Sequence, residues 1–359
     1  MGLQHASGHS RGAERDTRGV EPGCVRRDMG MRENRTGHSQ SDGSGLVVLK
    51  SSRDGCSAWL FSTKELPYEI RPSPGAGLGV FATRRILAGK CVLSEAPLVT
   101  HEKVHAHGVV TWPIESLDDK VRRLSPAKRA EFHALSQNEK YGVEKTLTGI
   151  WMTNAFTVEH ALDGTPQRAA VFSVVCRFNH SCRPNLHNEW REEKGSKVVF
   201  AAEDIEEGAE LTVTYLPKKG LLRAERQAGL FDNFCFYCHC SLCAQVGSAL
   251  KRSERRQERL IKLDRLIEAV EPRLRENGRT SQSLDTLTAL VEEKISLLAM
   301  EGLPMTWGLR DLYLCAVESK RSGADDKARA YAARAAECAL RGGGDECNSY
   351  VALRAFLAA

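Results

Sequence analysis

The nine residues Arg177-Phe-Asn-His-Ser-Cys-Arg-Pro-Asn185 carry most of the information in this chain. They place an amide, an imidazole and a thiol next to one another in a polar segment. Asn, Ser and Pro all favour turns for local backbone reasons, so this composition alone is typical of an ordinary turn. The surroundings favour a functional interpretation, because the segment follows the apolar run Ala169–Cys176 and precedes a strand, a tyrosine and a cysteine cluster.

The overall composition is that of an ordinary folded protein. The chain has 359 residues, of which 42% are hydrophobic and 27% are charged, enough for one large domain or two moderate ones. No stretch approaches the ~20 apolar residues that cross a bilayer, and we see no signal-peptide core, so we expect neither a membrane nor a secreted protein. The mild formal net charge of +5 does not argue for direct nucleic-acid binding.

Four cysteines lie close together, namely Cys235, Cys238, Cys240 and Cys243. Disulfide frameworks are typical of small secreted chains, whereas this density in a longer chain indicates a metal site in a reducing compartment. Four buried cysteines without a metal would be the alternative, and the close spacing disfavours it.

The N-terminal part differs in composition from the rest. Up to about residue 45 it is rich in Gly, Ser, Arg and His and nearly free of aromatic side chains, which leaves little apolar surface to offset the entropy of ordering. We predict a disordered tail over residues 1–65. Ordered sequence then begins near Leu66, with short strands expected at Tyr68–Arg71, Val80–Ala82 and Cys91–Leu93.

Residues 101–170 are predicted to form a helical insert. From Leu117 to Ile150 the sequence is charged and has a helical period. Strands are expected again at Lys197–Ala202 and Glu210–Tyr215, so the region as a whole is predicted to be a compact, mostly β domain. The apolar face expected for the insert consists of Val121, Leu124, Phe132 and Leu135.

Beyond the cysteines the chain changes to helical periodicity. Apolar residues recur at helical spacing from Leu260 to Val270, where we expect Pro272 to end the helix, and again from Leu284 to Leu298. The basic run Lys251–Arg259 contains interspersed Glu and is typical of a solvated helix face.

The last two helical segments, Leu309–Val317 and Lys327–Leu340, are Ala-rich and are predicted to pair in antiparallel fashion, as in helical repeats. The sequence has no clean repeat period. A plain bundle that caps the core and a peptide-binding repeat therefore both stay open.

Four elements stand in a fixed order: Gly75-Ala-Gly-Leu-Gly-Val-Phe-Ala82, Asn179-His-Ser-Cys182, Glu210-Leu-Thr-Val-Thr-Tyr215 and Cys238-His-Cys-Ser-Leu-Cys243. A glycine-rich turn alone is common, but the four together resemble SET-domain protein-lysine methyltransferases, in particular the SMYD-like and fungal SET group. The MYND zinc finger of SMYD proteins is missing, because residues 83–176 contain only Cys91 and Cys176.

The resemblance implies a mostly β SET fold, with short curved sheets, a knot-like C-terminal crossing and a helical insert, followed by an all-α C-terminal domain. The implied boundaries are 66–216 for the SET domain, 217–246 for a post-SET zinc segment and 247–359 for the helices. It also implies a monomeric enzyme of the nucleus or cytoplasm that transfers methyl groups from S-adenosylmethionine to lysine side chains of a protein, histone or non-histone. The alternative is a catalytically weak SET-like scaffold or reader that acts through protein interactions.

The resemblance further implies roles for single residues. Glycines let a ligand approach the backbone closely, so the first turn would hold the amino-acid end of the cofactor. Tyr215 would be the catalytic residue, because a phenol can hydrogen-bond the acceptor amine and orient its lone pair. The implied cofactor-binding residues are Gly75, Ala76, Gly77, Leu78, Asn154, Asn179, His180 and Phe236.

Zinc is the metal that the resemblance implies, with Cys182, Cys238, Cys240 and Cys243 as its ligands. Structural zinc takes four tetrahedral ligands, and the cysteine array from 238 to 243 supplies three. Cys182 would tie the segment after the catalytic strand to the cofactor loop. Cys235 offers a competing, all-local fourth ligand, and we place Cys182 ahead of it.

Overall fold

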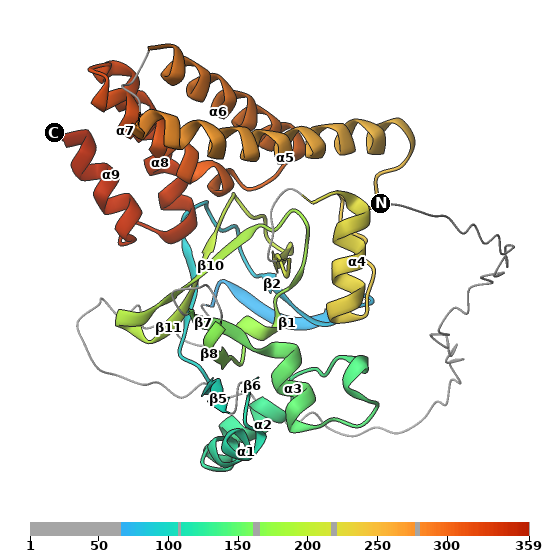
Figure 1. The fold of residues 1–359 in the computed structure, drawn as a ribbon. Coiled ribbons are helices and arrows are strands. Elements are labelled where there is room, and N and C mark those ends of the chain that lie inside the picture. Colours follow the sequence, from blue (N-terminus) through green and yellow to red (C-terminus); the bar gives the residue numbers. More distant parts are fainter. Residues whose placement is uncertain (1–65, 107–108, 161–165, 217–220, 277–280, 359) are drawn as a thin grey trace, which may run out of the picture. The chain divides into compact units, whose positions relative to one another are not determined.

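The computed structural model describes residues 66–106, 109–160, 166–216, 221–276 and 281–358 (Figure 1). The tail predicted over residues 1–65 lies outside the described residues. Among the described helices, none combines the length and apolar character needed to cross a membrane.

The strands form several small sheets. The first has the order β1-β2-β12-β9, with bounds Tyr68–Ser73, Gly77–Ala82, Glu210–Val213 and Asn179–His180. The second has the order β10-β11-β3, with bounds Leu186–Arg191, Ser196–Ala201 and Cys91–Glu95. The third has the order β4-β8-β7, with bounds Val99–Glu102, Pro166–Val171 and Phe156–His160. A separate pair consists of β5 (Val104–Ala106) and β6 (Val109–Thr111).

The first sheet brings three of the sequence motifs together. Its inner strand β12 runs antiparallel to β2 on one side and parallel to β9 on the other. Thr212 lies opposite Asn179, and Val213 lies opposite His180. The glycine-rich motif and the Asn-His pair therefore flank the strand that leads to Tyr215.

The hairpin between β1 and β2 is a tight turn. Ala76 donates its backbone N–H to the Ser73 carbonyl at 3.0 Å, and Gly75 has φ 75°, as the third position of a type II turn requires. Gly77 also has positive φ, whereas Gly79 does not. Gly79 is needed for a different reason, because a Cβ there would overlap the Glu210 carboxylate.

The predicted helical insert, residues 101–170, contains the three short helices α1 (Ile114–Arg122), α2 (Pro126–His133) and α3 (Leu147–Asn154), and it also contains β5, β6, β7 and most of β8. Ser125 caps α2 through a hydrogen bond from the Lys128 N–H, and Pro126 starts the helix, where its missing N–H costs nothing. The predicted apolar face is confirmed, since Val121, Phe132 and Leu135 are buried in one cluster and Leu124 packs against it.

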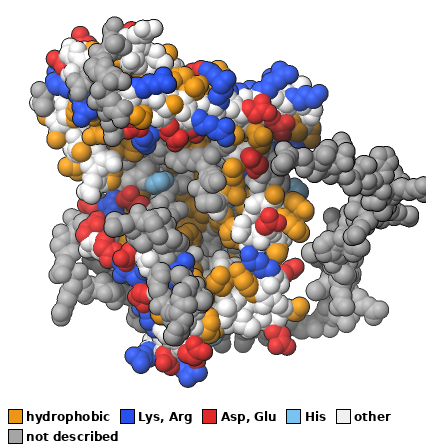
Figure 2. Space-filling model, viewed as in Figure 1, with side chains coloured by type: hydrophobic (Ala, Val, Ile, Leu, Met, Phe, Trp, Pro, Cys, Tyr) orange, Lys and Arg blue, Asp and Glu red, His pale blue; other side chains and the backbone are white. Residues whose placement is uncertain are grey.

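The helices that follow the strands are α4 (Arg223–Phe234), α5 (Gly247–Glu276), α6 (Ser281–Glu301), α7 (Leu309–Arg321), α8 (Asp325–Gly343) and α9 (Asn348–Ala358). The predicted end of α5 at Pro272 is wrong, because the helix continues to Glu276. The proline removes one backbone hydrogen bond, but Leu274 beyond it is 2% exposed and packs in the core cluster of the helices, which favours continuation of the helix. Lys251, Arg252 and Arg255 are exposed on α5, and Figure 2 shows basic and acidic side chains intermixed over this layer.

Arg191 on β10 fastens the helices to the strands. Its guanidinium is buried, lies 5.4 Å from the centre of the Phe200 ring and donates to the Gly343 carbonyl at the end of α8. It also pairs with Glu189 at 2.7 Å and with Glu346 at 3.4 Å. Because breaking a buried pair leaves an uncompensated charge, Arg191 fixes where α8 ends on the sheet formed by β10 and β11.

Candidate active site and metal centre

Asn179 is the point at which three motifs meet. Its side-chain amide donates to the Leu78 carbonyl at 3.2 Å and to Glu210 Oε1 at 2.7 Å. This one side chain therefore links the glycine-rich hairpin to β9 and β12, in addition to the backbone pairing of β2 with β12. Gly75 and Gly77 have no atom within 4 Å of the position that a Cβ would occupy, so the backbone of this turn is open to a ligand.

Asn185, at the other end of the nine-residue segment, makes a second attachment to β12. Its Oδ1 accepts from the Thr212 N–H at 2.8 Å, and its Nδ2 donates to the Glu210 carbonyl at 2.9 Å. The sequence placed this residue in the segment but assigned it no role. A side-chain amide can donate and accept at once, which is the property that this bridge uses.

Tyr215 is held at both ends by the segment 178–180. Its phenol donates to the Phe178 carbonyl at 2.8 Å, and its backbone N–H donates to His180 Nδ1 at 3.0 Å. Burial raises the pKa of Tyr215 above its usual range, and the nearby Cys176 and Glu210 add to the effect. The phenol is therefore neutral near pH 7, so it acts as a hydrogen-bonding group and not as a base.

An aromatic group surrounds Tyr215. The rings of Phe234, Phe236 and His180 have centroids 4.9, 6.4 and 5.4 Å from the ring of Tyr215. Phe236 was predicted at this site from the sequence, whereas Phe234, the nearest of the three, was missed. The signal was available in the spacing Phe-Cys-Phe, because a sharp turn at the middle residue can bring both rings to one side.

Cys235 makes that turn. It is the only non-glycine residue with positive φ among the described residues, at 55°, and it follows the last residue of α4. Its conformation is left-handed, which costs an L-residue roughly 1–2 kcal/mol. The turn directs the chain from α4 into the cysteine array.

Asn154 is placed at the end of α3, apart from the hairpin. Its side-chain amide donates to the carbonyls of Ser136 at 2.7 Å and Ile150 at 2.8 Å. Its own carbonyl accepts from the Cys176 thiol at 3.3 Å. Both amide hydrogens are engaged, so only the side-chain oxygen is left for a ligand, and no hydrogen bond joins Asn154 to the other predicted cofactor residues that the structure describes.

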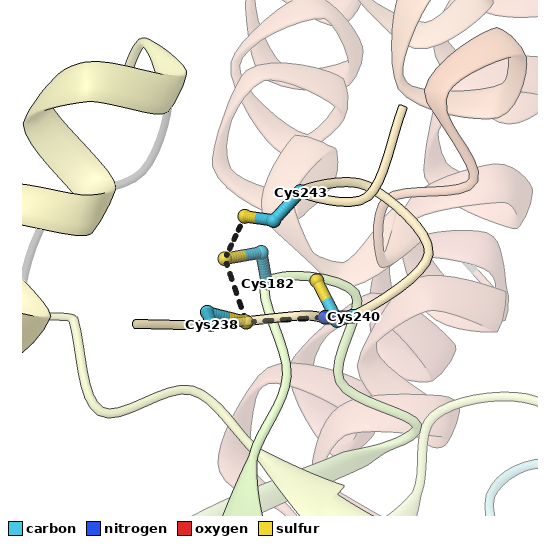
Figure 3. Close-up of side chains that lie close together, drawn as sticks. All are labelled: Cys182, Cys238, Cys240 and Cys243. Atoms are coloured by element: carbon cyan, nitrogen blue, oxygen red, sulfur yellow. Dashed lines mark hydrogen bonds between the residues drawn. The ribbon is translucent and has the colours of Figure 1, made fainter. Parts of the chain in front are cut away.

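The four cysteines expected to bind metal lie in one group (Figure 3). Their sulfur atoms are all within 4.8 Å of one another, with 3.5 Å between Cys182 and Cys243 and 4.0 Å between Cys182 and Cys238. A tetrahedral zinc with Zn–S bonds of about 2.3 Å would set its sulfurs about 3.8 Å apart. The group includes Cys182 and leaves out Cys235.

Donor groups surround these sulfurs. The backbone N–H of Cys240 donates to Cys238 Sγ at 3.4 Å, and the buried guanidinium of Arg226 donates to Cys243 Sγ at 3.6 Å. His180 Nε2 lies 3.3 Å from Cys182 Sγ. Four thiolates around a divalent metal carry a net charge of −2, so a buried cation and N–H donors fit a metal–thiolate centre better than four neutral thiols.

Glu95 on β3 binds the segment that precedes the Asn179-His180 motif. Its carboxylate accepts from the backbone N–H groups of Ser173, Val174 and Val175 at 2.8, 3.0 and 2.8 Å. This holds the turn that leads into Arg177. This role could not be predicted from the sequence, because a single acidic residue at a strand end is common.

Lys197 on β11 is a second residue that the sequence did not single out. It is 6% exposed, and its Nζ lies 5.0 Å from the centre of the Phe156 ring. No described carboxylate forms an ion pair with it. Burial lowers the pKa of Lys197 from 10.5 to about 8.

Residues 77–216 match the SET domain family. With the sheets and motifs described above, this establishes that the chain contains a SET domain. Its relatives carry names of methyltransferases. One, "Histone-lysine N-methyltransferase set5" of Schizosaccharomyces pombe, is 26% identical over 201 residues, which cover 56% of this chain and 58% of that protein.

Two further relatives are vertebrate proteins. "Histone-lysine N-methyltransferase SMYD3" of Homo sapiens is 33% identical over 91 residues, 25% of this chain and 20% of the human protein. "N-lysine methyltransferase SMYD2-B" of Danio rerio is 29% identical over 161 residues, 42% of this chain and 36% of the fish protein. The matches thus span little more than half of the yeast relative and less of the other two.

Proposed function

We propose that this chain is a protein-lysine N-methyltransferase with S-adenosylmethionine as the methyl donor. The observation that carries the proposal is the position of Tyr215, at the end of the SET domain, with its phenol and its backbone both bonded to the segment Phe178–His180. The names of the relatives support a lysine amine as the acceptor and histones as the first substrates to test, which would place the activity in the nucleus.

Among the cofactor-binding residues that we propose, those of the glycine-rich turn fit the amino-acid end of S-adenosylmethionine. The open backbone at Gly75 and Gly77 suits a zwitterionic amino-acid group, which needs N–H and C=O partners without a Cβ in the way. Ala76 and Leu78 would contribute backbone only. When bound, S-adenosylmethionine supplies an activated methyl group on a sulfonium centre.

Tyr215 would orient the acceptor. The lysine amine has an ordinary pKa of about 10.4 and must be neutral to offer its lone pair. The Tyr215 hydroxyl donates its hydrogen bond to the Phe178 carbonyl. The lone pairs of the phenol oxygen are therefore available to accept a hydrogen bond from the amine N–H. The rings of Phe234 and Phe236 would exclude water and favour a cationic centre beside them.

For the cysteine centre we propose zinc, held by Cys182, Cys238, Cys240 and Cys243. All four ligands would be thiolates when bound, and the proposal is supported by the sulfur separations of 3.5 and 4.0 Å from Cys182, which lie on either side of the about 3.8 Å expected for tetrahedral zinc. We also propose that 66–216, 217–246 and 247–359 act as SET domain, zinc segment and helical domain, with the last forming one wall of a substrate groove.

The test is transfer of a labelled methyl group. Purified protein is incubated with methyl-labelled S-adenosylmethionine and core histones, a lysine-containing peptide array or a cell extract. Tyr215→Phe removes one hydroxyl that donates to Phe178, and we expect it to lower turnover by at least about 100-fold while cofactor binding persists. Tyr237→Phe is the matched control, since Tyr237 is 56% exposed and contacts Phe231 only as a stacked ring.

Titration calorimetry with S-adenosylmethionine separates the alternatives. Binding without methyl transfer to any acceptor would point to a scaffold or reader. Failure to bind the cofactor, or full turnover by Tyr215→Phe, would contradict the proposed function.

A further inference from the structure

We infer that the His180 imidazole is a positioning residue that couples the cysteine metal centre to Tyr215. The inference rests on the proposed function, in which Tyr215 orients the acceptor and the four cysteines hold a metal. His180 connects the two sites through its two ring nitrogens: Nδ1 bonds to the backbone N–H of Tyr215 at 3.0 Å, and Nε2 lies 3.3 Å from Cys182 Sγ.

The partners determine which nitrogen carries the proton. A backbone N–H can only donate, so His180 Nδ1 must accept from Tyr215 and the proton belongs on Nε2. Nε2 therefore donates to Cys182 Sγ. A metal-bound thiolate has no proton and can only accept, so metal binding at Cys182 favours this one arrangement.

The imidazole takes the place of a missing strand hydrogen bond. β9 has only two residues, and its ladder with β12 ends where Ser181 N donates to the Val213 carbonyl at 3.0 Å. Cys182 then leaves the sheet for the metal centre, so no backbone carbonyl of β9 continues the ladder to Tyr215. The N–H of Tyr215, which has no strand carbonyl to donate to, donates to the His180 side chain instead.

Both attachments of Tyr215 therefore depend on the same short segment. The phenol is held by the carbonyl of Phe178 and the backbone by the ring of His180, while Cys182 anchors the segment two residues later. Release of the metal would free Cys182 and let the imidazole rotate away from Tyr215. The cysteine centre would then set the position of the catalytic phenol as well as stabilise the fold.

Two substitutions divide the bridge into its halves. In His180→Asn the amide oxygen falls near the position of Nδ1 and can still accept from Tyr215, but the side chain is too short to reach Cys182. In His180→Gln the amide nitrogen falls near the position of Nε2 and can still donate to Cys182, but the acceptor for Tyr215 is lost. The two variants therefore remove one hydrogen bond each, and their side chains have nearly the same polarity and size.

Metal retention is the first readout. The zinc-loaded protein is challenged with a chromogenic chelator, and the rate and midpoint of zinc release are measured. Loss of a hydrogen bond to a metal ligand typically lowers metal affinity about 10–100-fold, so we expect this loss in His180→Asn and near-wild-type retention in His180→Gln. Equal retention in wild type and His180→Asn would overturn the inference.

Backbone amide exchange at Tyr215 is the second readout, measured by mass spectrometry on overlapping peptides that begin before Tyr215 and differ in whether they include it. In wild type we expect removal of zinc to accelerate exchange of the Tyr215 amide. In His180→Asn its exchange should be nearly the same with and without zinc, because the link to Cys182 is already broken. The β1–β2 hairpin serves as the internal control for folding. Zinc-independent exchange at Tyr215 in wild type would refute the coupling.

A third measurement needs no variant, so it holds even if both substitutions prevent folding. In protein loaded with ¹¹³Cd, a proton on His180 Nε2 that donates to Cys182 Sγ should show scalar coupling to the metal. A proton found on Nδ1 would contradict the assignment. None of these readouts requires methyl transfer, so failure of the bridge and failure of the proposed enzymatic activity give different results.

Discussion

Replacing Lys197 with methionine should stabilise the protein at neutral pH. Methionine has nearly the same length as lysine, so it fills the same space in the core without the buried charge. Lys197 is 6% exposed, its Nζ lies 5.0 Å from the centre of the Phe156 ring, and no carboxylate of the described residues forms an ion pair with it. Burial lowers its pKa from 10.5 to about 8. The folded state thus holds this proton more weakly than the unfolded chain, and the charged form is penalised.

The size of the penalty follows from the two pKa values. The difference between 10.5 and about 8, at about 1.4 kcal/mol for each pKa unit, corresponds to about 3 kcal/mol when Lys197 is fully charged. The charged form regains about 1 kcal/mol from the aromatic ring, which methionine loses. We therefore expect Lys197→Met to raise the free energy of unfolding by about 2 kcal/mol at pH 7.

The pH dependence gives the sharper test. Between pH 8 and 10.5 the unfolded chain binds more protons at Lys197 than the folded protein does, so this residue makes wild-type stability rise with pH in that window. Methionine does not titrate. The advantage of the variant should accordingly shrink by about 2 kcal/mol between pH 7 and pH 10.

Urea unfolding followed by circular dichroism at the two pH values measures this difference directly, because other titrating groups are common to both proteins and cancel. Lys90→Met is the matched control, since Lys90 is exposed, and it should leave the free energy of unfolding nearly unchanged at either pH. A variant less stable than wild type at pH 7, or an advantage that is the same at pH 7 and pH 10, would refute the reasoning.

Three further predictions concern the site. Cys182→Ser should lower both the zinc bound per chain and the melting temperature. Cys235→Gly should keep full zinc and raise the melting temperature, because glycine adopts the left-handed conformation with about 1 kcal/mol less strain. Metal analysis combined with thermal unfolding distinguishes the two variants. Gly79→Ala should displace the Glu210 carboxylate from Asn179 and weaken S-adenosylmethionine binding by roughly tenfold in calorimetry, and unchanged binding would show that this contact is dispensable. Glu95→Ala should cost about 3 kcal/mol in urea unfolding, because it strips the carboxylate from buried backbone N–H groups; a loss below about 1 kcal/mol would contradict that role.

The sequence predicted the elements that depend on local pattern. Pro74 and Gly75 specify the turn, and apolar spacing located the insert and the later helices, since these signals act over a few residues. The SET fold and the cysteine group came from motifs in a fixed order. Pro272 misled the prediction of α5, because the burial of Leu274 beyond it, which no local pattern shows, favours continuation of the helix.

The rest of the site could not be predicted, because it depends on which strands pair. Glu95 supports residues 173–175 from a strand about 80 positions earlier, and nothing near it in sequence marks this contact. Lys197 has the sequence context of a strand residue on a solvated face. Its burial becomes visible only once β11 is the middle strand of its sheet, where all six of its residues are buried.

The cysteine group also has a topological consequence. Cys182 and Cys238 are 56 positions apart, and the chain between them contains β10, β11, β12 and α4. A metal that joins them closes a ring, and closing a ring of that length removes about 4 kcal/mol of chain entropy from the unfolded state. The metal-bound protein must therefore either release its ion in order to unfold or unfold as a closed ring with two open tails. Metal release and unfolding are therefore coupled, and a change in the affinity for the metal changes the free energy of unfolding.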